Sequence, residues 1–170
     1  MSTKLESGAM FPLLTVPCAG GRTVRLGGAR RGWQLIVVYR GRHCPICSRY
    51  LAKLDGMAKR FTELDTEIIA VSADPRDRAE QAKAEWAIGF DIAYGLSLDA
   101  MRALGLYISA PTDGAPHPFP EPALFVVNPE GRAQIIEIAN APFVRPDLET
   151  ILSGLAFIRE KNYPIRGTMA

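Results

Sequence analysis

The chain has 170 residues, of which 48% are hydrophobic and 22% are charged. This length and composition are typical of one globular domain with its own apolar core, and they exclude a disordered protein. The net charge is only +2, with acidic and basic residues interleaved, so the composition argues against nucleic acid or a membrane surface as a partner. Residues 1–8 are polar and lack the apolar run of a signal peptide, so we expect a cytoplasmic protein.

The first half of the chain predicts strands that alternate with helices. Short strands at 13–16 and 23–26 enclose a glycine-containing turn and predict an antiparallel hairpin. The continuous apolar runs at 34–39 and 67–72 are rich in β-branched residues and predict strands covered on both faces. The order of the elements predicts parallel pairing of these two strands through a right-handed crossover.

Two helices are expected to follow the two buried strands. Pro45 suits the first turn of the first helix, in which apolar residues recur at helical spacing as far as residue 64. Asp74 and Pro75 predict the N-cap and the first turn of the second helix.

The second half predicts a different order of elements. It contains an edge strand at 90–94, a short helix capped by Ser97, a loop at 109–122, a hairpin formed by 123–127 and 133–138, and a final helix that begins near Pro146. The loop carries five prolines, and its length and stiffness are typical of a loop over a functional site.

Together the elements predict an α/β fold with a mixed central sheet, helices on both faces and an N-terminal β-hairpin extension. We expect one domain over residues 11–161, with a flexible N-terminus at 1–10 and a C-terminal tail at 162–170.

Cys44 and Cys47 stand directly after a predicted strand, at the start of the predicted helix. Free backbone N–H groups and the helix dipole favour an anion there, and such placement lowers the pKa of a cysteine from about 8.5 to about 3.5–7.5. Cys47 lies one helical turn further on, within the buried stripe, and can attack a mixed disulfide formed at the first sulfur. We predict that Cys44 is the nucleophile and that Cys47, the less accessible thiol, resolves the adduct.

Four residues close to the pair are expected to shape the site: Tyr39, Arg42, His43 and Pro45. His43 either tunes the thiol and shuttles a proton, or is a partly exposed loop residue. Arg40 and Arg42 assist a thiolate if their side chains point inward.

Other interpretations of the cysteines remain open. A lone Cys-x-x-Cys is also half of a zinc site, which Cys18 with His43 or His117 would have to complete because there is no second cysteine pair. A second alternative is that the two cysteines are ordinary buried core residues that lie close together by coincidence. Cys18 lies in a predicted turn, and we expect it to be inert rather than resolving.

Three segments resemble one known family. Residues 38–47 (VYRGRHCPIC) resemble the approach to the active site in peroxiredoxin-like proteins of the alkyl hydroperoxide reductase/thiol-specific antioxidant (AhpC/TSA) family. Residues 69–75 (IAVSADP) and 122–131 (PALFVVNPEG) resemble the second strand and the hairpin of that family. The resemblance, over about residues 11–158, implies a thioredoxin fold with an N-terminal extension. It also implies peroxide reduction by a cysteine that thioredoxin or glutathione recycles.

The sequence departs from the peroxidase pattern of this family. Cys44 stands where the family has threonine or serine, three residues before the peroxidatic cysteine, which aligns with Cys47. Pro122 stands where the family has arginine, and it resembles the cis-proline of thioredoxin-like disulfide reductases, whose neighbouring backbone pairs with a substrate chain. A cis X–Pro bond costs only about 0.5–1 kcal/mol. Val38 occupies the position of the buried aspartate of thioredoxins, which accepts a proton from the second cysteine.

These departures favour a thiol-based oxidoreductase that catalyses dithiol–disulfide exchange, with Pro122 shaping the docking cleft. The nearest alternative is a thiol-dependent peroxidase that reduces hydroperoxides, and a third is a non-enzymatic zinc-binding or redox-sensor module. We expect no cofactor beyond the cysteine pair, a thioredoxin- or glutathione-type reductant, and a disulfide or hydroperoxide substrate. Exposed sheet edges or helix ends would allow a homodimer.

Overall fold

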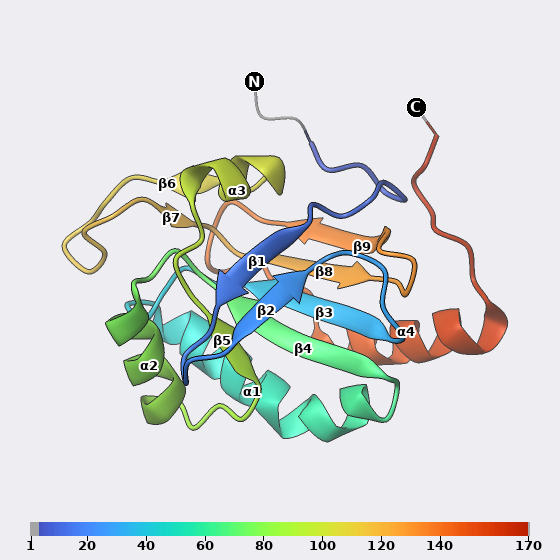
Figure 1. The fold of residues 1–170 in the computed structure, drawn as a ribbon, viewed down its shortest axis with the longest axis horizontal. Coiled ribbons are helices and arrows are strands. Elements are labelled where there is room, and N and C mark those ends of the chain that lie inside the picture. Colours follow the sequence, from blue (N-terminus) through green and yellow to red (C-terminus); the bar gives the residue numbers. More distant parts are fainter. Residues whose placement is uncertain (1–3, 170) are drawn as a thin grey trace.

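A five-stranded sheet forms the centre of the structure, a computed structural model that describes residues 4–169 (Figure 1). Its strand order is β5 (Asp91–Ala93), β4 (Thr66–Val71), β3 (Trp33–Val38), β8 (Ala123–Val127) and β9 (Ala133–Ile138). The first three strands are parallel, and β8 is antiparallel to both of its neighbours. The predicted mixed sheet is therefore confirmed.

Three helices cover one face of this sheet: α1 (Pro45–Thr62), α2 (Arg76–Glu85) and α4 (Leu148–Lys161) (Figure 1). Successive side chains of a strand point to opposite faces, so alternate residues of β3, Trp33, Leu35 and Val37, pack beneath these helices. Helix α1 follows β3 directly, which places its first turn at the carboxyl end of the central strands.

The opposite face is covered by α3 (Leu98–Ala103) and by a hairpin of β1 (Leu14–Pro17) and β2 (Thr23–Leu26). Ile36 and Val38 of β3 point into this second apolar layer. Helices on both faces and the N-terminal hairpin extension are thereby confirmed.

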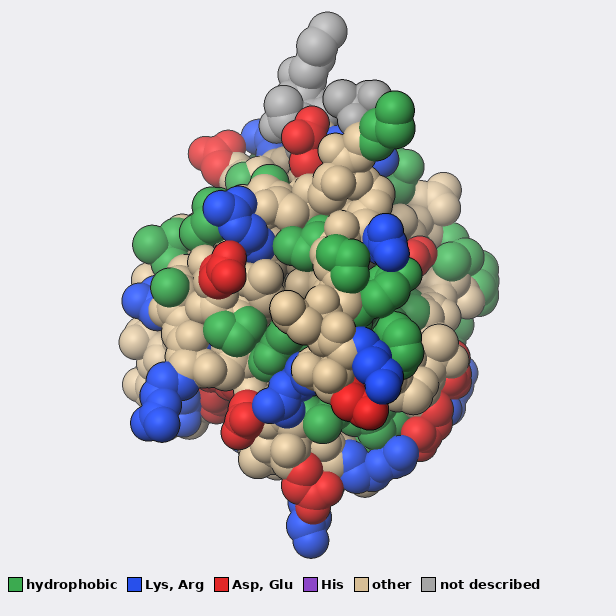
Figure 2. Space-filling model, turned by 90° about the vertical axis from the view of Figure 1, so that its right-hand side faces the viewer, with side chains coloured by type: hydrophobic (Ala, Val, Ile, Leu, Met, Phe, Trp, Pro, Cys, Tyr) green, Lys and Arg blue, Asp and Glu red, His purple; other side chains and the backbone are tan. Residues whose placement is uncertain are grey.

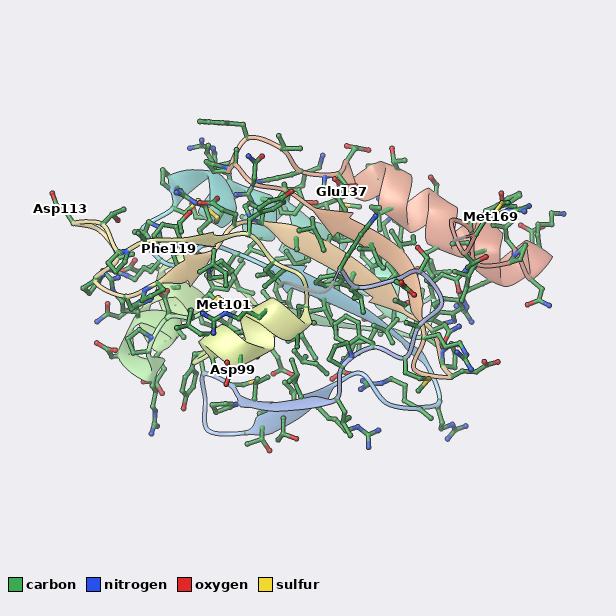
Figure 3. The ribbon with its side chains drawn as sticks, turned by 90° about the horizontal axis from the view of Figure 1, so that it is seen from above. Asp99, Met101, Asp113, Phe119, Glu137 and Met169 are labelled. Carbon is green, nitrogen blue, oxygen red and sulfur yellow. A yellow bond between two sulfur atoms is a disulfide. The ribbon has the colours of Figure 1, made fainter. Side chains whose placement is uncertain are left out.

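The proline-rich loop contains secondary structure that its sequence does not predict. Strands β6 (Ile108–Ser109) and β7 (Phe119–Pro120) pair at its base, so the loop closes like a two-stranded ribbon. Figure 3 shows Asp113 at the tip that extends from the body of the protein, and Phe119 where the chain returns. Phe119 is buried, which anchors the returning arm.

Asp74 does not cap α2, and this expectation was wrong. The N-cap is Pro75, which makes no side-chain capping bond. Because β3 and β4 are adjacent and parallel, the residues that follow them lie side by side, and Asp74 is turned toward the loop after β3. There its Oδ2 accepts a hydrogen bond of 2.7 Å from the backbone N–H of Arg42. The Asp74 side chain is fully buried.

The N-terminal part of the chain is hydrogen-bonded to both outer strands of the sheet. Ala19 N donates to Ile92 O of β5 at 2.8 Å, and Gly8 N donates to Ala133 O of β9 at 2.9 Å. Residues 4–10, part of the predicted flexible N-terminus, therefore run beside β9, while their flexibility stays a prediction.

No helix among residues 4–169 combines the length and the apolar character needed to cross a membrane. Figure 2 shows basic and acidic side chains scattered among apolar ones over the face it presents. On this face, charge is not gathered into a single basic patch, as the balanced composition predicts.

Candidate redox site

The two cysteines lie in the first turn of α1. Cys44 is the N-cap residue and Pro45 is the first helical residue, as the sequence predicts. The Cys44 Sγ accepts a hydrogen bond from Cys47 N at 3.2 Å, so a free N–H group of the helix terminus points at the sulfur. The two residues form a disulfide, with their Cα atoms 5.2 Å apart. The predicted placement of a dithiol–disulfide pair at a helix N-terminus is confirmed.

Both sulfurs are buried in this oxidised form. Cys44 is 1% exposed and Cys47 is 0% exposed, and both belong to the apolar layer that contains Tyr39 and Leu51. The expected difference in accessibility between the two thiols is absent here. A reacting partner therefore reaches the sulfurs only when the residues above them move aside.

The guanidinium of Arg145 contacts both sulfurs. Its Nη2 lies 3.0 Å from Cys47 Sγ and 3.8 Å from Cys44 Sγ. Its Nε donates to Pro142 O at 2.7 Å, and its guanidinium lies 5.2 Å from the centre of the Tyr50 ring. Burial lowers the pKa of Arg145, but a guanidinium keeps its charge at neutral pH. The site thus holds a fixed positive charge where a thiolate forms.

Arg145→Gln is expected to make the reduced pair less reactive. A positive charge at this distance lowers the pKa of a thiol by about 1–3. Loss of the guanidinium should therefore slow alkylation about tenfold or more near pH 6. The measurement is the rate of iodoacetamide modification of the reduced protein between pH 5 and 9. Arg42→Gln is the matched control, because that guanidinium does not touch the sulfurs. Identical pH profiles for Arg145→Gln and the wild type would contradict this role of Arg145.

Arg40 and Arg42 do not point at the sulfurs, because carboxylates bind both. Arg42 Nη2 lies 2.6 Å from Glu85 Oε1, on the outside of the protein. Arg40 Nε lies 3.0 Å from the buried Glu121 Oε2, an ion pair whose N–H is not aligned for a hydrogen bond. The role considered for these two arginines is filled by Arg145 instead.

Pro122 immediately precedes β8 beside the site but is not a cis-proline. Every peptide bond within residues 4–169 is trans, so that expectation was wrong. Glu121 N donates to Tyr107 O at 2.9 Å, which keeps the chain before the proline extended and paired. Pro122 lines a small pocket together with Tyr50 and Arg145, and its part in a docking cleft stays a prediction.

Tyr39 is a core residue below the site. It is fully buried, its ring meets Trp86 edge-on at 5.9 Å, and burial raises the pKa of its hydroxyl. His43 is half-buried against Phe119, with ring centres 4.7 Å apart, and desolvation lowers its pKa. His43 is thus packed under the proline-rich loop rather than freely exposed.

The zinc alternative gains no support. Within the described part of the chain, no three His, Cys, Asp or Glu side chains are grouped so that they could hold a metal ion. Cys18 is buried, and burial raises the pKa of its thiol to about 11, which agrees with the expected inert residue.

Sequence reasoning missed three residues of this site: Arg145, Asp74 and Glu121. Topology offered a signal for Asp74, because residues after adjacent parallel strands meet at one edge of the sheet. For Arg145 the signal was weaker. This residue lies in the segment between β9 and α4, which crosses the carboxyl end of β3, where the cysteines lie. Nothing in the sequence marks Glu121 as the partner of Arg40.

A disulfide-forming Cys-x-x-Cys in the first turn of a helix, directly after the central strand of this mixed sheet, defines a thioredoxin-type thiol oxidoreductase. The sequence profile of the AhpC/TSA family matches residues 7–135. The chain therefore belongs to the AhpC/TSA family, and it is a thiol-based redox enzyme, as the sequence analysis predicted.

Solved peroxiredoxin structures share the fold at low sequence identity. A peroxiredoxin-like protein from Aquifex aeolicus superimposes with a TM-score of 0.78 at 16% identity, over 92% of this chain and 89% of that one. PrxQ from Xylella fastidiosa gives 0.76 at 15% identity, over 92% and 99% of the two chains. Peroxidoxin BcpB from Mycobacterium tuberculosis gives 0.73 at 16% identity, over 91% and 99%. No curated protein matches the sequence.

Proposed function

We propose that the protein catalyses dithiol–disulfide exchange, with Cys44 as the nucleophile and Cys47 as the resolving cysteine. The observation that supports this most strongly is the closed disulfide within one helical turn, beside the guanidinium of Arg145. Because the two sulfurs are already paired, the cycle needs no unwinding of α1 to bring them together.

The proposed reaction balances in two steps. The Cys44 thiolate attacks one sulfur of the substrate disulfide, and the other substrate sulfur leaves as a thiolate that takes up a proton. Cys47 then attacks Cys44 Sγ, which releases the second substrate thiolate and forms the Cys44–Cys47 disulfide. Two electrons pass to the substrate, and an external thiol reductant restores the dithiol. Arg145 stabilises whichever sulfur carries negative charge.

A second candidate is hydroperoxide reduction, because Arg145 Nη2 lies nearer to Cys47 Sγ than to Cys44 Sγ. In that reaction the Cys47 thiolate attacks a peroxide oxygen, the O–O bond breaks, and water or an alcohol leaves. Cys44 then attacks the sulfenic acid, forms the same disulfide and releases water. Membership of the AhpC/TSA family supports this candidate.

Side-by-side turnover separates the two candidates. With dithiothreitol as reductant, we expect kcat/KM for a protein disulfide such as that of insulin to exceed the values for hydrogen peroxide and tert-butyl hydroperoxide by more than about tenfold, once the uncatalysed rates are subtracted. The reverse ranking would establish the peroxidase. Cys18→Ala is the control, because this buried thiol takes no part in either scheme.

The partners belong to the same proposal. A thioredoxin- or glutathione-type thiol is the reductant that this chemistry requires, and the disulfide pair itself is the only redox group the scheme needs. The cytoplasmic location and the homodimer stay predictions.

A further inference from the structure

We propose that Asp74 and His117 hold a shared proton for the redox chemistry of the Cys44–Cys47 pair and exchange it through His43. The inference rests on the proposed function and deepens it, because it assigns acid–base groups to the same site. Asp74 and His117 act through another residue and are positioning residues.

The core of the proposal is a short approach between two buried polar atoms. Asp74 Oδ1 lies 3.5 Å from His117 Nε2, and neither atom has a hydrogen-bond partner among residues 4–169. The Asp74 side chain is 0% exposed, whereas that of His117 is 25% exposed. The pair therefore reaches from the interior to the solvent, from which it can regain a proton.

The hydrogen bond of His117 Nδ1 favours a proton between these two atoms. His117 Nδ1 lies 3.0 Å from Pro118 O, a carbonyl that can only accept, so Nδ1 carries a hydrogen. A neutral His117 would then turn the lone pair of Nε2 toward a carboxylate oxygen, and two acceptors repel each other. One proton removes the conflict, either as imidazolium beside carboxylate or as imidazole beside carboxylic acid.

His43 also lies close to this carboxylate oxygen, and Gly41 makes this possible. A Cβ at position 41 would lie 2.8 Å from Asp74 Oδ1 and 3.0 Å from His43 Nδ1. Any other residue would therefore separate the two groups, and the φ of +143° at Gly41 also favours glycine. Both ring nitrogens of His43 are buried without a partner within residues 4–169.

The charges around the cluster favour a mobile proton. Desolvation and the charges of Arg40 and Arg78 lower the pKa of His43, while the Asp74 carboxylate acts in the opposite direction; the net lowering favours an imidazole that can accept a proton. Arg78 Nη1 also donates to Gly114 O at 2.9 Å, which holds the proline-rich loop over the cluster.

The remaining titratable and charged groups near the cluster are otherwise engaged. Glu121 is bound by Arg40 and by Ser109 Oγ, the latter at 2.6 Å. The Tyr39 hydroxyl beneath the cluster has its pKa raised by burial, and the Arg42 guanidinium pairs with Glu85 on the outside. None of these groups neutralises the Asp74 carboxylate.

The redox cycle needs an internal proton source. Each reduction of a substrate disulfide releases two thiolates, and an alkyl thiolate is a poor leaving group unless it is protonated. Both protein sulfurs are buried in the oxidised form, so water has limited access to them and an internal acid can supply the proton. In the proposed scheme, the proton passes from the Asp74–His117 pair to His43, which precedes Cys44 in the chain, and on to the leaving sulfur when substrate is bound.

Asp74→Asn tests this with little disturbance of the structure, since the amide oxygen still accepts from Arg42 N and the amide N–H can donate to His117. The probes are hydroxyethyl disulfide, whose alkyl thiolate needs a proton to leave, and the aromatic disulfide DTNB, whose acidic thiol leaves unprotonated. We expect Asp74→Asn to slow reduction of the alkyl disulfide about 10–100-fold and to change the aromatic rate less than about twofold. Equal losses with both, or no loss with either, would overturn the proposal.

His117→Asn is the second variant, because its amide can replace Nδ1 as the donor to Pro118 O while removing the titrating nitrogen. It should show the same dependence on the leaving group. Asp99→Asn is the matched control: Asp99 is a 96% exposed carboxylate on α3, which Figure 3 labels. It should leave both rates unchanged.

The redox equilibrium of the protein decides the question even if no disulfide is turned over. A thiolate formed on reduction makes the pair bind its proton more tightly, so reduction takes up an extra proton over part of the pH range. Over that range, the equilibrium constant for reduction of the protein by dithiothreitol should fall by a further tenfold for each unit by which the pH rises. This corresponds to an extra fall of about 30 mV in the reduction potential of the two-electron couple. Asp74→Asn should remove this extra slope, and an unchanged slope would overturn the proposal. A wild type that reduces neither disulfide would instead contradict the proposed function.

Discussion

Cys44→Ser is expected to abolish disulfide reduction, with a loss of at least about 10³-fold, because a serine hydroxyl does not form the anion that attacks sulfur. Cys47→Ser should lose multiple turnover to a similar extent but for another reason. Its Cys44 still attacks, and no second thiol then releases the substrate. A covalent complex with the substrate should therefore accumulate, visible as a mass increase that dithiothreitol removes.

The two cysteine variants also identify the attacking sulfur. If Cys47 is the nucleophile, as in the peroxide scheme, the covalent complex appears in Cys44→Ser instead. Cys18→Ser should trap nothing, because it keeps both Cys44 and Cys47 and removes only a buried thiol with a raised pKa. Equal trapping by all three variants would contradict a defined nucleophile.

Glu121→Ala is expected to give the largest loss of stability among the charged residues of the site. Glu121 is 5% exposed, binds Arg40 and accepts a hydrogen bond from Ser109, and Arg40 also lies over the Phe119 ring. Removing one partner leaves the other charge buried and unpaired, which should lower the free energy of unfolding by about 2–4 kcal/mol. The Arg40 side chain keeps 21% exposure, which places the loss below that of a fully enclosed pair.

Urea unfolding of three variants tests the contribution of this ion pair. Glu149→Ala breaks the exposed pair between Glu149 and Arg60 and should have a far smaller effect, because water screens those charges. The double variant Arg40→Leu/Glu121→Leu should recover part of the loss, since it leaves no unpaired charge. A loss no greater for Glu121→Ala than for Glu149→Ala would show that the buried pair contributes little.

Local sequence patterns predicted most of the fold. The β-branched runs identified β3 and β4, and the helical spacing after Pro45 placed α1 with its cysteines in the first turn. These elements follow from short-range rules: side-chain periodicity, proline geometry and the need to bury apolar surface. The pairing of β6 and β7 was missed because two residues of each strand give no periodic pattern.

The charged half of the site depends on tertiary structure and was largely missed. Arg145 reaches the sulfurs from a residue nearly 100 positions away from Cys47 in sequence. The predicted role of Asp74 was wrong because its local pattern, an acid before proline, is typical of a helix cap, whereas in the fold its carboxylate accepts from the backbone N–H of Arg42 in the adjacent loop. Long-range contacts between polar side chains leave no periodic trace in the sequence.

The N-terminal segment is hydrogen-bonded to both edge strands of the sheet. These bonds affect how readily two copies could associate through their sheet edges. An open sheet ends in rows of unsatisfied N–H and C=O groups that invite a foreign strand. Here one stretch of chain begins beside Ala133, at the start of β9, and after the first hairpin strand reaches Ile92 of β5, so it occupies part of both edges of the sheet. Two copies that met margin to margin would find the backbone at Ala133 and at Ile92 already taken.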